Sequence, residues 1–344
     1  MAGIFDVAKL AGVSTATVSR ALAGKDHVSA KAKAKVEAAA AELGYVASAS
    51  AYTMATGRAR NIGVVLPHVD RWFFSTCLLG AENILIEHGY DLTFYNLGSK
   101  PENRDRIFSE FLLRKRVDAV LTIAVRLSQE ELRNLNRMKK PFIGIGGPIV
   151  GARSVSMDDF AAGKLATEHL IALGHTKIGN IGGIGGFDAE FNQPLLRRTG
   201  YQAAMDAANL EIKKSWIAET TFSIDHGYKV AKQMLGDPRN APTAIFCSAD
   251  EIAFGAIMAA KDLGLRVPED VSIIGIDNHE MSEFFGLTTI SQDVKGQGEA
   301  AAKMLIDILN GPDLGDAVNI EKQYDWPIEL TVRSSTARPP ATHR

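Results

Sequence analysis

Short apolar runs and helical stretches alternate along most of this 344-residue chain, and this alternation limits the folds it can adopt. From residue 61 onward, apolar runs typical of strands occur at 62–66, 91–96, 118–123, 141–145, 177–181, 243–246 and 271–276. Helical stretches occur between them, at 75–88, 102–115, 159–173, 195–208, 223–236 and 249–263. Such alternation predicts parallel sheets joined by right-handed crossovers. Seven strand–helix units favour two doubly wound α/β lobes, the layout of periplasmic-type sugar-binding proteins, over a single lobe.

The same spacing predicts where each lobe begins and ends within a core at 61–338. We expect the first lobe to span about 61–157 and 290–320, and the second about 158–289 and 321–338, before a short tail at 339–344. Ligands of parallel α/β sheets bind outside the carboxyl ends of the strands. The cleft between the two lobes is therefore the expected ligand site.

The charge of the chain is unevenly distributed. Residues 1–60 carry eight lysines and arginines and four acids, a net charge of +4, whereas the remaining 284 residues carry −6. A small basic head on an acidic body is typical of a polyanion-binding module joined to a non-binding one. A charge of this size also fits an ordinary protein surface, so the charge alone leaves both interpretations open.

Composition predicts a soluble, cytoplasmic protein. Hydrophobic residues make up 46 % of the chain, which is enough to fill cores and excludes a disordered chain. Cys77 and Cys247 form no CxxC pair and no disulfide framework, as expected in a reducing cytosol. The N-terminus has acids and polar residues where a secretory signal would be apolar, and no apolar run approaches the ~18 residues of a membrane span.

Three short helices are expected in residues 1–46, at about 4–11, 15–23 and 30–43. Gly12 ends the first helix, because glycine tolerates the positive φ of a tight turn. Ser14 lies at the N-cap of the second helix, where its oxygen can accept from free backbone N–H groups. Two helices joined by such a turn predict a helix-turn-helix unit, whose second helix enters the major groove of DNA.

The second helix has an exposed face without acids. Thr15, Ala16 and Arg20 point away from its apolar side, and Arg20 can bond guanine in bidentate fashion, worth roughly 1–3 kcal/mol of discrimination. The flanking hydroxyl groups suit phosphate oxygens. The residues of the head that we assign to DNA are Ser14, Thr15, Ala16, Thr17, Ser19, Arg20 and Ser29. The alternative, from periodicity alone, is an amphipathic helix with an ordinary polar face.

Residues 47–60 form a linker rich in alanine and small polar residues. Isolated helices below ~12–15 residues rarely hold in water, so this segment would need a partner to fold against. Met54 is the one large apolar side chain in its second half, and an apolar side chain in the minor groove can wedge between base steps. We include Met54 among the DNA-binding candidates, although the residues alone favour a flexible linker with Met54 lightly buried.

Polar and aromatic residues near the ends of the predicted strands are candidates for binding a ligand in the cleft. Asp277 and Asp250 follow apolar runs and lie at strand carboxyl ends, although either could also cap a turn. Arg197 opens a predicted helix and could fork onto hydroxyls or a carboxylate, unless it is ordinary surface charge. The other candidates are a crossover glutamine and aromatic residues that could equally belong to the core: Trp72, Phe74, Phe222 and Gln292.

Many stretches of the chain resemble the lactose-repressor (LacI/GalR) family of bacterial transcription regulators. In the head they are DVAKLAGVSTATVSRALAG at 6–24 and VSAKAKAKVEAAAAELGY at 28–45, followed by a hinge ending in Thr56-Gly57. In the body they include NIGVVLP at 61–67, ATEHLIALGHTKIGNIGG at 166–183, RRTGY at 197–201, SADEIAFGAIMAAKDLGLRVPEDVSIIGIDN at 248–278, LTTISQD at 287–293 and VRSST at 332–336. The matching stretches cover essentially the whole chain, and their combination is specific although no single one is.

The resemblance implies a repressor that binds a palindromic operator as a homodimer, with residues 47–60 forming hinge helices that pair in the minor groove. Met54 then takes the place of the family's usual leucine wedge. The effector contacts that it supports are Arg197, Phe222, Asp250, Asp277 and Gln292. A sugar or sugar phosphate is the favoured effector, a nucleobase is an alternative, and no other cofactor is implied. The C-terminus has no leucine heptads, so we expect a dimer rather than a coiled-coil tetramer.

The chain departs from the family pattern at three places. Ser48 replaces a frequent asparagine and Tyr52 a frequent arginine in the hinge, so the grip on the minor groove can differ from the common pattern. Gly146 and Gly147 stand where relatives often carry a polar ligand-binding residue, commonly aspartate. This last departure predicts a roomier pocket.

The motifs of common enzyme classes fail in this sequence. GGIGGF at 182–187 follows a predicted strand, but position 188 is aspartate where a dinucleotide fingerprint needs glycine. The sequence has no P-loop, no G-x-S-x-G and no HExxH, and its eight histidines lack metal-site spacing. We therefore expect no enzyme activity. A stand-alone periplasmic-type sugar-binding protein is the alternative function, but it would need a signal peptide and would not need residues 1–60.

Overall fold

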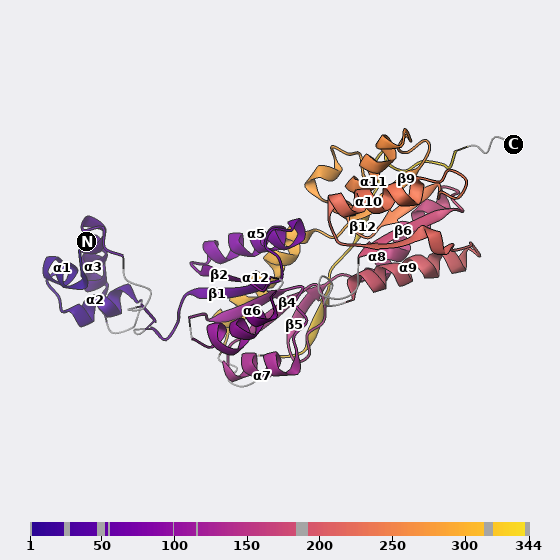
Figure 1. Cartoon of the computed structure of the whole chain (residues 1–344). Helices are drawn as coiled ribbons and strands as arrows, with labels where there is room; N and C mark the ends of the chain where they lie inside the picture. Colours follow the sequence, from indigo (N-terminus) through magenta and orange to yellow (C-terminus); the bar gives the residue numbers. More distant parts are fainter. Residues whose placement is uncertain are drawn as a thin grey trace.

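The computed structural model describes residues 2–23, 28–46, 52–53, 56–98, 100–114, 116–183, 192–312 and 319–340. These residues form a three-helix unit followed by two α/β lobes (Figure 1). In Figure 1 the three-helix unit lies at one end, the first lobe lies next to it, and the second lobe lies at the far end with the C-terminus. Among the described residues, no helix combines the length and apolar character needed to cross a membrane.

The three-helix unit consists of α1 (Ile4–Ala11), α2 (Thr15–Leu22) and α3 (Ala30–Glu42). Each helix contributes one apolar face to a small core made of Val7, Ala8, Ala11, Val18, Ala21, Val36, Ala39 and Ala40. Gly12 ends α1 with a φ of 69°, a left-handed conformation that glycine adopts without strain. The compact core fixes the angle between α1 and α2, and so determines which side of α2 faces solvent.

The linker between the three-helix unit and the first lobe is described only in part. Met54, the predicted minor-groove wedge, and Ser48 lie outside the described residues. At the end of the linker, the Asp118 carboxylate accepts from the backbone N–H groups of Ala59 and Arg60, at 2.9 and 2.8 Å. These two bonds anchor the last residues of the linker on the first lobe.

A parallel six-stranded sheet forms the first lobe. Its strands in spatial order are β11 (Lys322–Asp325), β5 (Arg153–Ser156), β4 (Phe142–Ile145), β3 (Ala119–Ile123), β1 (Asn61–Leu66) and β2 (Asp91–Asn96). Alternate residues of β1 enter two different cores, because successive side chains of a strand point to opposite faces. One core contains α5 (Trp72–Glu87) and α12 (Val294–Asn310). The other core contains η1 (Ile107–Phe111), η2 (Leu112–Arg114) and α7 (Gln129–Arg137), after α6 (Pro101–Arg106).

The second lobe repeats this design. Its strands in spatial order are β12 (Glu329–Thr331), β10 (Thr288–Ser291), β9 (Ser272–Asp277), β8 (Ala244–Cys247), β6 (Ile178–Gly183) and β7 (Ile217–Thr220), with only β12 antiparallel. The helix α8 (Asp159–Ala172) packs on α9 (Gln193–Ala207), and α10 (Ile224–Leu235) packs on α11 (Asp250–Asp262). Two short 3-10 turns complete it, η3 (Lys214–Trp216) and η4 (Glu280–Ser282).

Glycines allow α8 and α9 to approach closely. A Cβ atom added at Gly163 would lie 2.1 Å from the carbonyl oxygen of Arg197, and one added at Gly200 would lie 2.1 Å from that of Phe160. No side chain fits at either position without moving the backbone of the facing helix. This close contact fixes the position of Arg197 relative to α8.

The chain passes between the lobes three times, at 157–158, 292–293 and 326–328. Our expectation that 321–338 belongs to the second lobe is wrong at its start, because β11 pairs with β5 in the first sheet. Residues 290–291 lie in β10 and so belong to the second sheet, not the first lobe. The sequence KQYD of β11 is short and polar, so it lacks the apolar run by which strands are recognised.

Candidate functional site

The side of α2 that faces away from the three-helix core carries the residues that the sequence assigns to DNA. Val18 and Ala21 are buried in that core. Ala16 and Arg20 are exposed on the opposite side, and no acid lies on the helix. The partly buried residues at the edges of this face are Thr15, Thr17 and Ser19. The helix therefore presents hydroxyl groups, a methyl group and one guanidinium to solvent.

The two serines at helix starts act as N-caps. Ser14 Oγ accepts from the backbone N–H of Thr17 at 3.1 Å and lies 2.9 Å from the Thr17 hydroxyl. Ser29 Oγ accepts from the backbone N–H of Ala32 at 3.2 Å. Both serines are exposed, so each lies at an accessible helix N-terminus, where the helix dipole favours negative charge.

A small cavity of about 80 Å³ lies between the lobes. The first lobe contributes Arg71, Phe73 and Phe74, which lie at and just before the start of α5. The residues from the second lobe come from strand ends and helix starts: Gln193, Arg197, Phe222, Ala249, Glu251 and Asp277. Two guanidinium groups, two carboxylates and three phenyl rings thus surround one space, a composition typical of a site for a small polar ligand.

Four of the seven predicted effector residues line this cavity, namely Phe74, Arg197, Phe222 and Asp277. The other three, Trp72, Asp250 and Gln292, are not among its lining residues. Each of these three contacts a residue that lines the cavity or the loop after β9. The structure therefore divides the predicted set into residues that line the cavity and residues that contact its lining or the loop after β9.

Asp277 ends β9 with a φ of 129°, a conformation that residues with a side chain rarely adopt. Gln292 Nε2 donates to Asp277 Oδ1 at 2.6 Å, and Gln297 Nε2 donates to Gln292 Oε1 at 3.0 Å. Burial raises the pKa of Asp277, and the charge of Arg197 opposes that rise. Gln292 thus orients the carboxylate from behind rather than facing the cavity itself.

Arg197 is buried between a carboxylate and a backbone carbonyl. Its Nε donates to Asp159 Oδ1 at 2.8 Å, and its Nη1 donates to the carbonyl oxygen of Ser248. Burial raises the pKa of Asp159, and the charge of Arg197 counters this. The guanidinium is therefore held rigidly at the cavity wall, with one acid already paired to it.

Asp250 is fully buried beneath the cavity. Its carboxylate accepts from Ser282 Oγ and Thr289 Oγ1, both at 2.7 Å, and from the backbone N–H of His279 at 2.9 Å. Burial, followed by the negative charge of Asp277, raises the pKa of Asp250. These hydrogen bonds fit the alternative that the sequence left open, an aspartate that caps a turn. Through them Asp250 holds the loop after β9 in place.

Trp72 bridges the two lobes at the edge of the cavity. Its ring stacks on His279 with 4.4 Å between the ring centroids, and its Nε1 donates to Glu280 Oε2 at 3.0 Å. A second bridge forms where Gln193 Nε2 donates to the carbonyl oxygen of Gly146 at 2.9 Å. The lobes are thus held together by contacts within the chain.

Sequence reasoning missed several lining residues. Arg71 precedes the aromatic run at 72–74, and Glu251 follows Asp250, so both stand beside predicted positions. A charged residue next to a strand end was the signal available for both. Gln193 lies at the first turn of α9, and nothing in the sequence indicated that it would face the first lobe.

A second cavity, of about 400 Å³, borders the glycine pair Gly146 and Gly147. The φ of Gly146 is 90°, and a Cβ added there would approach Ala124 Cβ to 3.3 Å. The absence of side chains at this pair leaves open space beside it. The space nevertheless lies next to Asp158 and Asp159 and shares no lining residue with the aromatic cavity.

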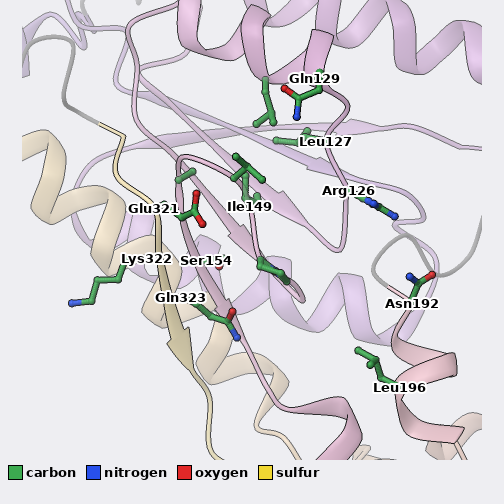
Figure 2. Close-up of a pocket in the computed structure, with 14 residues that line it drawn as sticks. Arg126, Leu127, Gln129, Ile149, Ser154, Asn192, Leu196, Glu321, Lys322 and Gln323 are labelled. Carbon is green, nitrogen blue, oxygen red and sulfur yellow. The ribbon is translucent and has the colours of Figure 1, made fainter. Parts of the chain in front are cut away.

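A third cavity, of about 650 Å³, lies between β5, β11 and the start of α9 (Figure 2). Figure 2 shows Ser154 and Gln323 along its bed and Asn192 and Leu196 on the side of the second lobe. No aromatic residue lines it, and Lys322 packs over the ring of Tyr324 at 4.6 Å. The cavity of about 80 Å³ is the better candidate for the ligand site, because its lining combines charged and aromatic residues.

Metal and thiol chemistry find no support in the part of the chain that the structure describes. No group of three or more histidine, cysteine, aspartate or glutamate side chains could hold a metal ion among these residues. Cys77 and Cys247 are free and buried, and burial raises the pKa of both thiols.

Comparison with known proteins places this architecture in a family. Residues 3–48 match the model of bacterial regulatory proteins of the lacI family, and residues 167–336 match that of the periplasmic binding protein-like domain. The chain is 36 % identical over 315 residues to the HTH-type transcriptional repressor PurR of Serratia proteamaculans (strain 568), covering 89 % of this chain and 90 % of that one. This chain belongs to the LacI family. It is also 35 % identical over 341 residues to PurR of Haemophilus influenzae (strain PittEE), covering 97 % and 98 % of the two chains.

Solved structures of LacI-family members show the same fold. The lac repressor dimer bound to operator and the anti-inducer ONPF matches with a TM-score of 0.82 and 26 % identity, covering 98 % of this chain and 99 % of that one. The complex of the transcriptional regulator CelR with cellobiose matches with a TM-score of 0.70 and 25 % identity, covering 97 % and 100 %. The chain is therefore a LacI-family transcriptional regulator with a helix-turn-helix DNA-binding domain, and not an enzyme.

Proposed function

We propose that this LacI-family regulator represses transcription from the cytoplasm by binding a palindromic operator as a homodimer, under the control of a small-molecule effector. A sugar is the favoured effector, bound in the cavity between the lobes. One observation carries the proposal: a single chain combines an acid-free, exposed helix face on α2 with a cavity between the lobes that is lined by charged and aromatic groups. The first can contact DNA, and the second can contact a ligand.

The DNA-binding role belongs to residues 1–46, with residues 47–60 as the hinge. Arg20 reads a guanine edge, and Thr15 and Ala16 contact neighbouring base edges. Thr17 and Ser19 bond phosphate oxygens, and the capped helix starts at Ser14 and Ser29 face the backbone of the duplex. In the dimer, two hinge segments pair on the minor groove and each inserts its Met54 between base steps.

The effector-binding role belongs to the cavity between the lobes. Asp277 accepts from hydroxyl groups of the ligand, Arg197 donates to its oxygens, and the rings of Phe74 and Phe222 cover its apolar faces. Gln292 holds Asp277, and Asp250 holds the loop that follows it. A volume of about 80 Å³ holds only a handful of water molecules. A sugar ring therefore enters only when the lobes separate.

Separation of the lobes couples the cleft to DNA. A ligand that changes the angle between the lobes moves the first lobe relative to that of the partner subunit. The end of the linker is bonded to Asp118 of the first lobe, so this movement changes the spacing of the two hinge segments. A coupling free energy of about 1–3 kcal/mol changes operator affinity by about 5- to 150-fold.

The test begins with the purified full-length protein. Selection from random duplexes identifies the operator, and a thermal-shift screen of sugars, sugar phosphates and purines identifies a ligand. Operator titrations with and without that ligand measure the coupling. The variant Asp277→Ala is expected to keep operator binding and lose the response to ligand. Operator binding that survives deletion of residues 1–57 would show that the assignment of the head is wrong.

The alternative function, a stand-alone sugar-binding protein, makes a different prediction in the same experiment. Such a protein would bind a ligand and show no preference among duplexes at low salt. The basic head, with its exposed Arg20 on a helix without acids, favours the repressor.

A further inference from the structure

The charged residues that line the cavity between the lobes do not compensate one another fully. Two arginines, Arg71 and Arg197, and two acids, Glu251 and Asp277, line it. The guanidinium of Arg197 already donates to the buried carboxylate of Asp159, which lies outside the cavity. Once this pair is counted as neutral, the remaining charged lining residues are two acids, Glu251 and Asp277, and one base, Arg71.

The two carboxylates of the cavity lack full compensation. Asp277 accepts from the neutral amide of Gln292. Glu251, at the first turn of α11, has no hydrogen-bonded side chain in the described part of the structure, and it feels the negative charge of Asp277 and the positive charge of Arg71. Burial and the charge of Asp277 raise the pKa of Glu251 to about 7. Two acids that line one cavity repel each other when both are ionised, and a cation or a strong donor placed between them removes that repulsion.

The aromatic lining suits the same kind of ligand. Phe73, Phe74 and Phe222 bring three ring faces or edges to the cavity. Aromatic faces attract ammonium groups, because the ring quadrupole is negative on its face. A phosphate dianion would instead meet two carboxylates within a space of about 80 Å³, where charge interactions are stronger than in water.

We propose that the effector of this cleft carries an amino group, which binds between the carboxylates of Glu251 and Asp277, and that the cleft discriminates against phosphorylated ligands. The inference rests on the proposed function, because it assumes that the effector binds in this cavity. It names the chemistry that the effector must have. An amino sugar and an aminated base share this chemistry, and the test separates the two.

The test compares matched ligands by calorimetry on the full-length protein. Glucosamine is compared with glucose and with glucosamine 6-phosphate, and adenine is compared with unsubstituted purine. At least one amino compound is expected to bind about tenfold more tightly than its partner without the amino group, the gain of a charge-assisted hydrogen bond. If that compound is glucosamine, its phosphorylated form is expected to bind more weakly still.

The variant Glu251→Gln keeps the size of the side chain and removes its charge. It is expected to abolish most of the preference for the amino compound, while Glu211→Gln, at an exposed position outside the cleft, leaves the preference unchanged. Operator binding and circular dichroism of Glu251→Gln show whether it folds. The isosteric change at a partly exposed helix start is expected to leave the circular dichroism spectrum unchanged.

The outcomes separate this inference from the proposed function. Equal or tighter binding of glucose, purine or the phosphorylated sugar overturns the inference, even when operator binding still responds to that ligand. Failure of both amino compounds to bind overturns it as well. If the unmodified protein binds no operator at all, the proposed function is contradicted instead. The calorimetric comparison then still decides whether the cleft prefers ligands that carry an amino group.

Discussion

Asp277 shows how a single residue of this protein combines strain with support. Its φ of 129° is unfavourable for every residue except glycine. This strained position nevertheless places the Asp277 carboxylate in the lining of the cavity. The chain of amides from Gln297 through Gln292 to Asp277 holds that geometry. Strained backbone at a ligand site is expected where the surrounding bonds over-determine one conformation.

Arg20 carries the first prediction at the residue scale. Replacement of Arg20 by alanine is expected to weaken binding to the selected operator by roughly 1–3 kcal/mol, because a bidentate contact to guanine is lost. Binding to random duplexes should change much less, since most of that affinity comes from phosphate contacts. Fluorescence anisotropy with both duplexes measures the two changes. An equal loss on both duplexes would assign Arg20 to the phosphate backbone instead.

Glu251 carries a prediction about pH. Burial raises its pKa from 4.5 to about 7 in the folded protein. The folded state then binds more protons than the unfolded state between those values. Its contribution to the free energy of unfolding is therefore complete below about pH 4.5 and is lost as the pH rises through about 7. The unliganded protein should lose stability across this window more steeply than Glu251→Gln, as measured by urea unfolding.

The comparison between the two proteins is needed because other groups act in the opposite direction. Burial lowers the pKa of His169, His175 and His279, so their contributions grow as the pH rises. The difference between the unmodified protein and Glu251→Gln removes the histidine contributions. Identical pH profiles for the two would show that Glu251 ionises like an exposed glutamate.

The sequence predicted the cavity better at strand ends than at helix starts. Arg197, Phe222 and Asp277 follow apolar runs or open a predicted helix, and the structure brings them around one cavity. Glu251 was missed because the pattern after a strand does not show which side of the next helical turn faces the cleft. Trp72 was assigned to the ligand and instead bridges the lobes, a contact that depends on how two separate sheets are placed.

At the scale of elements, apolar runs predicted the longer strands better than the short ones. The seven expected runs correspond to β1, β2, β3, β4, β6, β8 and β9. The strands that were missed are short, and several lie at or near sheet edges: β5, β7, β10, β11 and β12. The expected helix at 102–115 is interrupted by the π-helical turn η1 (Ile107–Phe111). Patterns of two to four residues carry too little signal to distinguish such strands from loops.

The close contact between α8 and α9 leads to a prediction about stability. Replacement of Gly200 by alanine would place a Cβ atom 2.1 Å from the carbonyl oxygen of Phe160, so α8 and α9 must separate. We expect a loss of about 1–3 kcal/mol in the free energy of unfolding, and weaker ligand binding because Arg197 moves with α9. Urea unfolding and calorimetry measure the two effects. Ala207→Ser, on the exposed side of the same helix, should change neither.

The bridge made by Trp72 gives a second prediction for elements. In this structure Trp72 stacks on His279 and bonds Glu280, so separation of the lobes must break both contacts. A ligand that enters the cleft is therefore expected to change the tryptophan emission. Trp72→Phe should reduce this change, and the remainder should come from Trp326, which packs on the cores of both lobes. Trp216 is buried within the second lobe, so Trp216→Phe should retain the ligand-induced change. Unaltered emission at saturating ligand would mean that the bridge stays closed.

At the scale of the whole molecule, the distribution of charge predicts a steep dependence on salt. The basic head carries +4 and the remainder of the chain −6, so attraction to DNA is confined to one end of each subunit. A dimer that makes about 6–10 phosphate contacts should lose about 10³- to 10⁵-fold in affinity between about 50 and 200 mM salt. Operator titrations over this range provide the slope. A slope near zero would exclude ion pairs between the basic residues of the head and the phosphates of the DNA.

The three passages between the lobes have a consequence for anyone who wishes to take the molecule apart. Neither lobe is a continuous piece of sequence, because α12 and β11 return to the first sheet after the second is almost complete. A fragment that ends near residue 312 would lack β11 and β12, and so would remove an edge strand from both sheets at once. Exchange of ligand specificity with another family member therefore requires the transplantation of interleaved segments, whereas residues 1–60 can be grafted as one block.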